Sequence, residues 1–202
     1  MRKTPILAAI GIVVFLLILV PSCSYNGLVR KSQSVDQQWA QVQSVYQRRA
    51  DLIPNLVQTV GGAANFEKST LTEVTNARAS VGRVNLPTAP TDAARLAEYE
   101  QAQNQLSSAL SRLLVVAENY PQLKATQGFR DLQTQLEGTE NRISVERQRF
   151  NDAVAVYDTS IRSFPNVLYA RKMGFQPKPY FSATPQAQSV PQVQFNFTQP
   201  SR

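Results

Sequence analysis

Histidine is absent from this chain of 202 residues, and cysteine occurs only once. A single cysteine cannot form a disulfide within the chain. Without histidine there is no Ser-His-Asp triad, no Cys-His pair and no histidine-ligated zinc or di-iron site. The eight glycines form neither a G-x-G-x-x-G motif nor a Walker loop, so nothing indicates a nucleotide-phosphate cradle. These absences disfavour the familiar classes of hydrolase and nucleotide-binding enzyme, and they favour binding or scaffolding.

Acidic residues are missing from both ends of the chain. All 14 lie between residues 36 and 158, and residues 32–165 carry 13 basic side chains against them. Residues 1–31 and 166–202 each carry four basic side chains and no acid, which gives the net charge of +7. A nucleic-acid binder usually has a basic stripe on its folded body. This body is close to neutral, so we expect no nucleic acid as a partner.

An apolar run from Ile6 to Val20 follows two basic residues and predicts a membrane anchor over residues 1–24. With its polar margins the run reaches the length of a spanning helix, about 20 residues. The alternative is a lipoprotein signal with an acylated Cys23, although Pro21 is unusual at such a site, and ordinary cleavage is a third outcome. Either anchor places the chain at the cell membrane, single-pass or lipid-anchored. We expect its body on the extracytoplasmic side.

Residues 25–165 show the periodicity of amphipathic helices, in which apolar residues recur at steps of three and four. Four apolar stripes cover residues 28–53, 57–81, 96–120 and 129–164. Prolines interrupt the pattern between the second and third stripes, where Thr91 or Asp92 can cap the next helix, and Pro121 interrupts it again. The sequence therefore predicts an all-α fold: an antiparallel up-and-down four-helix bundle over residues 25–165, between the anchor and an extended C-terminal segment.

Pro54 governs how the first two helices are expected to meet. Proline inside a helix costs about 3 kcal/mol, whereas the first turn accommodates it. We therefore expect one helix to end near Asp51 and the next to begin near Pro54, with a tight reversal between them. In an up-and-down bundle this reversal and the junction between the third and fourth helices lie together at a tip far from the membrane. The residues there are either helix caps and ion pairs or a docking surface for a protein partner: Arg48, Arg49, Asp51, Asn55, Glu118, Asn119 and Tyr120.

Six segments resemble the LemA family. They are YNGLV (25–29), YQRRADLIPNLV (46–57), FEKSTLTEVTNARA (66–79), AENYPQLKA (117–125), LEGTENRISVERQRFNDAV (136–154) and FPNVLYARKMGFQPKPYF (164–181). The resemblance covers nearly the whole chain beyond the anchor, and it implies a membrane-anchored antiparallel helical bundle. It supplies no activity, because the family as a whole lacks an established biochemical function.

Five polar residues fall among apolar positions that should face the bundle interior: Glu67, Arg78, Glu140, Asn141 and Arg142. A buried charge is costly unless it is paired. We interpret these residues as an internal polar network that fixes helix register, with a ligand or ion site between helices as the alternative. Carboxylates suit a hard cation, but no acidic loop has calcium spacing, and we expect no metal or cofactor.

The C-terminal segment, residues 166–202, is rich in proline and contains no acid. We expect it to be extended, either packed against the bundle or added as a strand to a partner. Its aromatic residues are too many for a solvated linker: Phe175, Tyr180, Phe181, Phe195 and Phe197. The up-and-down topology would bring the basic residues of both ends to the membrane surface: Arg30, Lys31, Arg171, Lys172 and Lys178.

These features predict a membrane-anchored scaffold or adaptor of the bacterial cell envelope that has no catalytic activity. Its partners would be the membrane, a protein and, in addition, a second copy of the chain. The alternative is a metal-dependent enzyme or ligand-binding protein that uses Glu67, Glu118 or Glu140. An enzyme would need an open pocket around these carboxylates, whereas a scaffold needs a filled interior.

Overall fold

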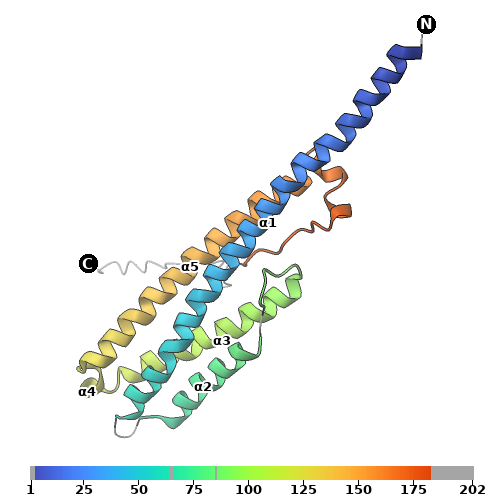
Figure 1. Cartoon of the computed structure of the whole chain (residues 1–202). Helices are drawn as coiled ribbons and strands as arrows, with labels where there is room; N and C mark the ends of the chain where they lie inside the picture. The colour runs from blue at the N-terminus through green and yellow to red at the C-terminus, as the bar shows by residue number, and fades with distance from the viewer. Residues whose placement is uncertain (1–2, 64–65, 85, 183–202) are drawn as a thin grey trace, which may run out of the picture.

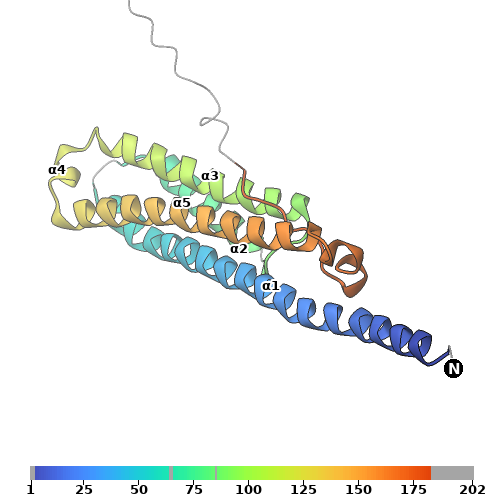
Figure 2. The same cartoon turned by 90° about the horizontal axis from the view of Figure 1, so that it is seen from above.

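The computed structural model describes residues 3–63, 66–84 and 86–182, with side chains from residue 25 onwards. This part of the chain is all-α. Its main helices are α1 (Lys3–Gly61), α2 (Lys68–Arg83), α3 (Ala93–Ala117) and α5 (Gln127–Arg162). The short helix α4 (Pro121–Lys124) lies between α3 and α5, and two short 3-10 helices, η1 (Asn166–Leu168) and η2 (Arg171–Met173), follow α5. Successive long helices run antiparallel, with α1 packed along α5 and α2 along α3 (Figures 1 and 2). The predicted up-and-down bundle is confirmed at this level.

Helix α1 passes through Pro54 without a break and ends at Gly61. The prediction that the first helix ends near Asp51 is therefore wrong, and the second helix begins only at Lys68. Proline lacks the N–H that would bond the carbonyl four residues earlier, which is that of Ala50. The Nε of Arg78, on α2, donates to this carbonyl at 3.1 Å instead. A donor from a neighbouring helix thus replaces the one that Pro54 removes.

Burial also favours the continuation of α1 beyond Pro54. Ile53, Leu56 and Val60 are buried on the face that packs into the bundle. Burying one such side chain contributes about 1.5–3 kcal/mol. Three of them together exceed the cost of about 3 kcal/mol for an interior proline, so the longer helix is the more stable one.

The later helix boundaries follow the sequence pattern more closely. Asp92 caps α3, because its side chain accepts a hydrogen bond of 2.9 Å from the backbone N–H of Ala94. Pro121 occupies the first turn of α4, where its missing N–H costs nothing. Thr126 caps α5 by accepting from the backbone N–H of Phe129 at 3.4 Å. The third and fourth predicted helices are thereby confirmed within a few residues.

The bundle interior consists of two hydrophobic cores. The proximal core, nearer the N-terminus of α1, contains Trp39, whose ring lies 5.4 Å from that of Tyr99 and 5.5 Å from that of Phe150. The distal core contains the buried residues of α1 from Ile53 onwards and those of α5 up to Leu136. The boundary between them falls at the same level of α1, α3 and α5, where polar side chains occupy the interior.

Residues 174–182 form an extended strap that runs back along α5. The side chain of Asn151 pairs with the backbone of Phe181 in both directions, at 2.9 and 3.1 Å. The Phe181 ring stacks on Trp39, with a centroid separation of 5.9 Å, and is buried in the proximal core. Packing of the tail against the bundle is confirmed up to residue 182. Phe195, Phe197 and the rest of residues 183–202 lie outside the described residues.

Candidate functional site

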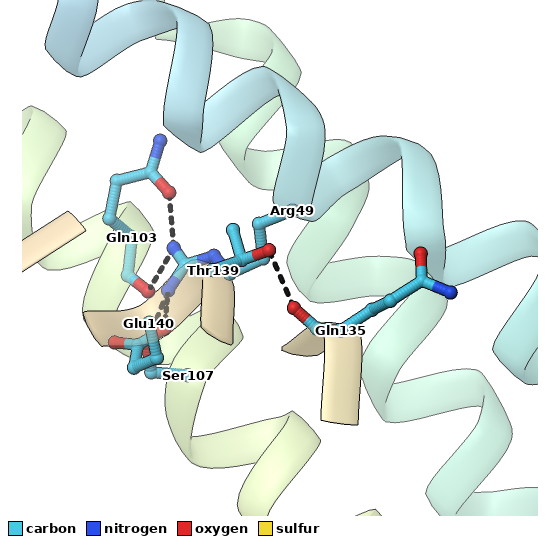
Figure 3. Close-up of polar contacts among 6 residues, drawn as sticks. All are labelled: Arg49, Gln103, Ser107, Gln135, Thr139 and Glu140. Atoms are coloured by element: carbon cyan, nitrogen blue, oxygen red, sulfur yellow. Dashed lines mark hydrogen bonds and ion pairs between the residues drawn. The ribbon is translucent and has the colours of Figure 1, made fainter. Parts of the chain in front are cut away.

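A buried arginine occupies the boundary between the two cores. Arg49 is 1% exposed, and its guanidinium binds groups from two other helices (Figure 3). It donates to the side-chain oxygen and the carbonyl of Gln103, at 2.5 and 3.3 Å, and to the hydroxyl of Ser107 at 2.6 Å. It also forms an ion pair of 2.9 Å with Glu140. We call these four residues the Arg49 layer.

The contacts of the Arg49 layer fix the positions of α1, α3 and α5 relative to one another along their axes. A buried charge is tolerated only when it is paired and hydrogen-bonded, and here the partners come from α3 and α5. Sliding any of these helices by one residue would break several bonds at once. The Nε of Arg49 is buried without a hydrogen-bond partner. Thr139, next to Glu140, bonds the carbonyl of Gln135 in its own helix at 2.7 Å (Figure 3).

The predicted internal network is mostly wrong in its membership. Only Glu140 belongs to the Arg49 layer, and its side chain is 54% exposed. Asn141 and Arg142 face solvent because Thr139 and Ile143 are the buried positions of that turn. Glu67 is exposed at the start of α2, where it accepts from the hydroxyl of Thr70 at 3.1 Å.

Arg78 is also exposed, and it binds the Ala50 carbonyl rather than Glu67. The predicted inward placement of Glu67 and Arg78 depended on helix two starting at Pro54. Since α2 starts at Lys68, the phase of that stripe was wrong.

The sequence did contain a signal for buried polar residues at the level of the Arg49 layer. Three apolar stripes each contain a step of seven residues, and each step has one inward position between its ends. The intermediate positions are Arg49 between Tyr46 and Ile53, Gln103 between Tyr99 and Leu106, and Thr139 between Leu136 and Ile143. All three are buried. Ser107 follows the inward position Leu106 and is only partly buried, so its place in the sequence pattern gave no such signal.

The predicted tip divides into two parts. Glu118, Asn119 and Tyr120 do lie at the far end of the bundle, in the turn between α3 and α4. Four others lie further back on α1, about 9–20 Å from its end at 1.5 Å per residue: Arg48, Arg49, Asp51 and Asn55. They do not converge with the first three, because α1 continues to Gly61.

An open groove of about 760 Å³ lies at the true tip. We call it the tip groove. One wall comes from the end of α1 and the turn after it, with Thr59, Gly62 and Ala63, and the other comes from Asn119 to Leu123. The rings of Phe66 and Tyr120 lie 5.0 Å apart beneath it. Both apolar and polar groups are therefore accessible at the end of the bundle.

A second groove, the side groove, of about 870 Å³, runs between α2 and α3 and is lined mainly by amide, hydroxyl and small side chains. At its edge Arg147 pairs with Glu100 at 2.8 Å, and the Glu100 carboxylate also accepts from the backbone N–H of Ser182 at 3.1 Å. Burial raises the pKa of Glu100 above its usual value of 4.5, although Arg147 acts in the opposite direction. This cluster holds the end of the strap.

The three carboxylates of the enzyme alternative are engaged separately. Glu140 pairs with Arg49, Glu118 pairs with Lys124 at 3.5 Å, and Glu67 bonds Thr70. Among the residues that the structure describes, no group of three or more cysteine, aspartate or glutamate side chains could hold a metal ion.

The basic residues predicted at the membrane surface are not equivalent. Arg30, Arg171 and Lys172 are exposed, and Lys31 donates to the hydroxyl of Ser160. The prediction that Lys178 contacts the membrane surface is wrong, because this residue is buried and its Nζ pairs with Asp36 at 2.9 Å. It cannot reach a headgroup while it holds the strap to α1.

The predicted anchor lies largely beyond what the structure describes. The backbone of α1 begins at Lys3, but the side chains of residues 3–24, that of Cys23 included, are outside the described part. Where side chains are described, no helix combines the length and the hydropathy needed to cross a bilayer.

Comparison with known proteins gives a family match and several relatives. The LemA family model matches residues 38–195, a range that includes the bundle from residue 38 onwards and the strap. Magnetosome protein MamQ 2 of Paramagnetospirillum magneticum is 24% identical over 198 residues, which cover 89% of this chain and 72% of that protein. Protein LemA of Metamycoplasma hominis is 22% identical over 160 residues, which cover 79% and 69%. Magnetosome protein MamQ of Magnetospirillum gryphiswaldense is 31% identical over 84 residues, which cover 42% of this chain and only 31% of that protein.

Proposed function

The chain belongs to the LemA family, and we propose that it is a membrane-anchored scaffold of the bacterial cell envelope that binds a protein partner through its tip groove. The observation that carries this proposal is the placement of the tip groove at the end of the molecule opposite the N-terminus (Figure 1). We assign no catalytic step to the chain.

The anchor in this proposal is the apolar run from Ile6 to Val20, acting as a spanning helix. The backbone of α1 is continuous from Lys3 to Gly61, so a spanning helix would pass directly into the bundle. Gly61 lies 36 residues beyond Tyr25 along α1, which corresponds to a rise of about 54 Å. A partner bound at the tip, on the extracytoplasmic side, would therefore be held well clear of the lipid headgroups.

The interior of the bundle supports a scaffold role. Two packed cores and the Arg49 layer fill the space between the helices, so the rigid body holds the tip groove at a fixed height. The groove is lined by Tyr120 and Pro121 beside polar groups, with the buried Leu123 at its base, and such a mixture is common in a surface that binds a peptide segment. The partner would be a protein with a short extended or helical segment, or a second copy of the chain.

A paired photo-crosslinking experiment in intact cells tests the proposal. A photoreactive amino acid replaces Gln122, in the tip groove, or Gln148, which is exposed on α5. We expect a discrete adduct from position 122 that is absent from position 148, and a shift of that adduct if the partner is a second copy carrying a larger tag. Adducts that are the same at both positions, or that occur at neither, would contradict the proposal.

A further inference from the structure

The turn between α5 and the strap exposes large apolar side chains. Residues 163–174, which we call the elbow, contain η1 and η2. Phe164 is 81% exposed and Leu168 66% exposed, and Val167 and Met173 are exposed beside them. Such a concentration of apolar groups on a soluble surface usually marks an interaction site.

The elbow is an ordered turn in which the backbone N–H groups of residues 167–170 donate to backbone carbonyls of residues 163–166. The side chain of Asn166 donates to the carbonyl of Ser160 at 2.9 Å and accepts from the hydroxyl of Tyr169 at 2.7 Å. Gly174 ends η2 with a φ of 88°, a left-handed conformation that favours glycine. Apolar side chains therefore point outwards from a backbone that is already hydrogen-bonded, which is the arrangement that an apolar medium requires.

The position of the elbow is fixed relative to the apolar run of α1. The ring of Phe175, just after the elbow, lies 5.6 Å from that of Tyr25, and Lys31 bonds Ser160, just before it. Tyr25 and Lys31 follow Val20 by about 8 and 17 Å along the helix. Figure 1 shows the elbow beside α1 at the end of the bundle from which the N-terminal part of α1 projects.

The elbow itself contains basic residues and no acid, and Asp36, which lines a groove together with Met173 and Gly174, is paired with Lys178. Arg171 and Lys172 are part of the elbow and are exposed, and Arg30 is exposed on α1. The acid next before the elbow, Asp158, is buried and accepts from the backbone N–H of Lys178. Apolar side chains with a basic rim are complementary to a bilayer interface that carries anionic headgroups.

We propose that the elbow is a second membrane contact, in which Phe164 and Leu168 enter the interface of the leaflet and Arg171 and Lys172 bind anionic headgroups. This inference rests on the proposed anchor, because the anchor brings the elbow to the bilayer. Two contacts, one from α1 and one from the end of α5, hold the bundle at a fixed tilt. A single helix would leave it free to pivot.

Tryptophan quenching by brominated lipid tests the elbow in the full-length chain. Leu168→Trp places a reporter at the elbow, and Val115→Trp is the matched control, because Val115 is 68% exposed at the other end of the bundle. Trp39 is fully buried in the proximal core and gives the background, measured in the unmodified chain. The vesicles contain phosphatidylcholine with brominated acyl chains, with or without phosphatidylglycerol.

We expect the emission added by Leu168→Trp to shift to shorter wavelength and to be lost in brominated vesicles, whereas that of Val115→Trp remains. Phosphatidylglycerol should increase the loss, and combined Arg171→Gln and Lys172→Gln changes should cancel the increase. Flotation with the vesicles reports the anchor separately. A chain that floats while residue 168 stays unquenched, or gains nothing from phosphatidylglycerol, overturns the elbow contact alone, and a chain that fails to float overturns the anchor as well.

Discussion

The hydrogen bond from Arg78 to the carbonyl of Ala50 should matter only while residue 54 is a proline. Arg78→Met keeps most of the aliphatic side chain but removes the donor. The Ala50 carbonyl is then left without a partner in a turn where Ala50 is largely buried. A hydrogen bond from a charged donor contributes about 1.5–3 kcal/mol. Because Arg78 is itself exposed, water can replace part of this hydrogen-bond energy, and we expect Arg78→Met to lower the free energy of unfolding by about 1–2 kcal/mol.

The test is a double-mutant cycle. In Pro54→Ala, the new N–H bonds the Ala50 carbonyl within α1 and the clash of the proline ring disappears, so this single change should stabilise the fold by up to about 3 kcal/mol. Adding Arg78→Met to it should cost less than about 0.5 kcal/mol. The coupling energy between the two positions would then be about 1 kcal/mol.

Urea unfolding of the full-length chain in detergent, followed by the fluorescence of Trp39, measures each free energy of unfolding. Arg83→Met, on the same helix but outside the contact with Ala50, is the control for loss of a positive charge from α2. An equal cost of Arg78→Met in the proline and alanine backgrounds would refute the reasoning. The continuity of α1 through Pro54 would then need another explanation.

Two further predictions concern the strap. Glu100 has a raised pKa, so the folded chain holds that proton more tightly than the unfolded chain, and this contribution to stability is lost as pH rises through the raised value. Going from neutral pH to about pH 5 should therefore stabilise the wild type relative to Glu100→Gln, and equal pH slopes in chemical unfolding would contradict this. Asn151→Ala removes both hydrogen bonds to the backbone of Phe181, and it should cost about 2 kcal/mol and speed chymotryptic cleavage at Phe181. An unchanged cleavage rate, with Asp152→Ala as the control, would show that other contacts hold the strap.

Patterns that act over a few residues were readable without coordinates. The helical stripes, the cap at Asp92 and the break at Pro121 each depend on neighbours within one or two turns, so sequence spacing was sufficient. The LemA resemblance, carried by short motifs, was confirmed by the family match. The same local reasoning failed at Pro54, because the intrinsic cost of a proline in a helix takes no account of a donor from another helix.

The candidate sites depended on contacts that no local pattern describes. Arg49 was predicted at the tip because Pro54 was expected to end the first helix near Asp51, yet it is the residue that faces Gln103 and Glu140. Lys178 looked like a free cation in a basic tail, and it pairs with Asp36, which lies 142 positions earlier. Helix α1 ends at Gly61, about three helical turns beyond the predicted end near Asp51, and the tip groove lies at that later end.

The sequence by itself determined the helical class, the number of long helices in the bundle, their alternating direction and the basic, acid-free ends of the chain. Hydrophobic periodicity and short connections are sufficient for these, since they are local properties of an amphipathic chain. Only the tertiary structure decided where α1 ends, which polar residues lie inside and which basic side chains remain exposed. In each case a partner distant in sequence supplied the hydrogen bond or opposite charge that made the otherwise costly arrangement stable.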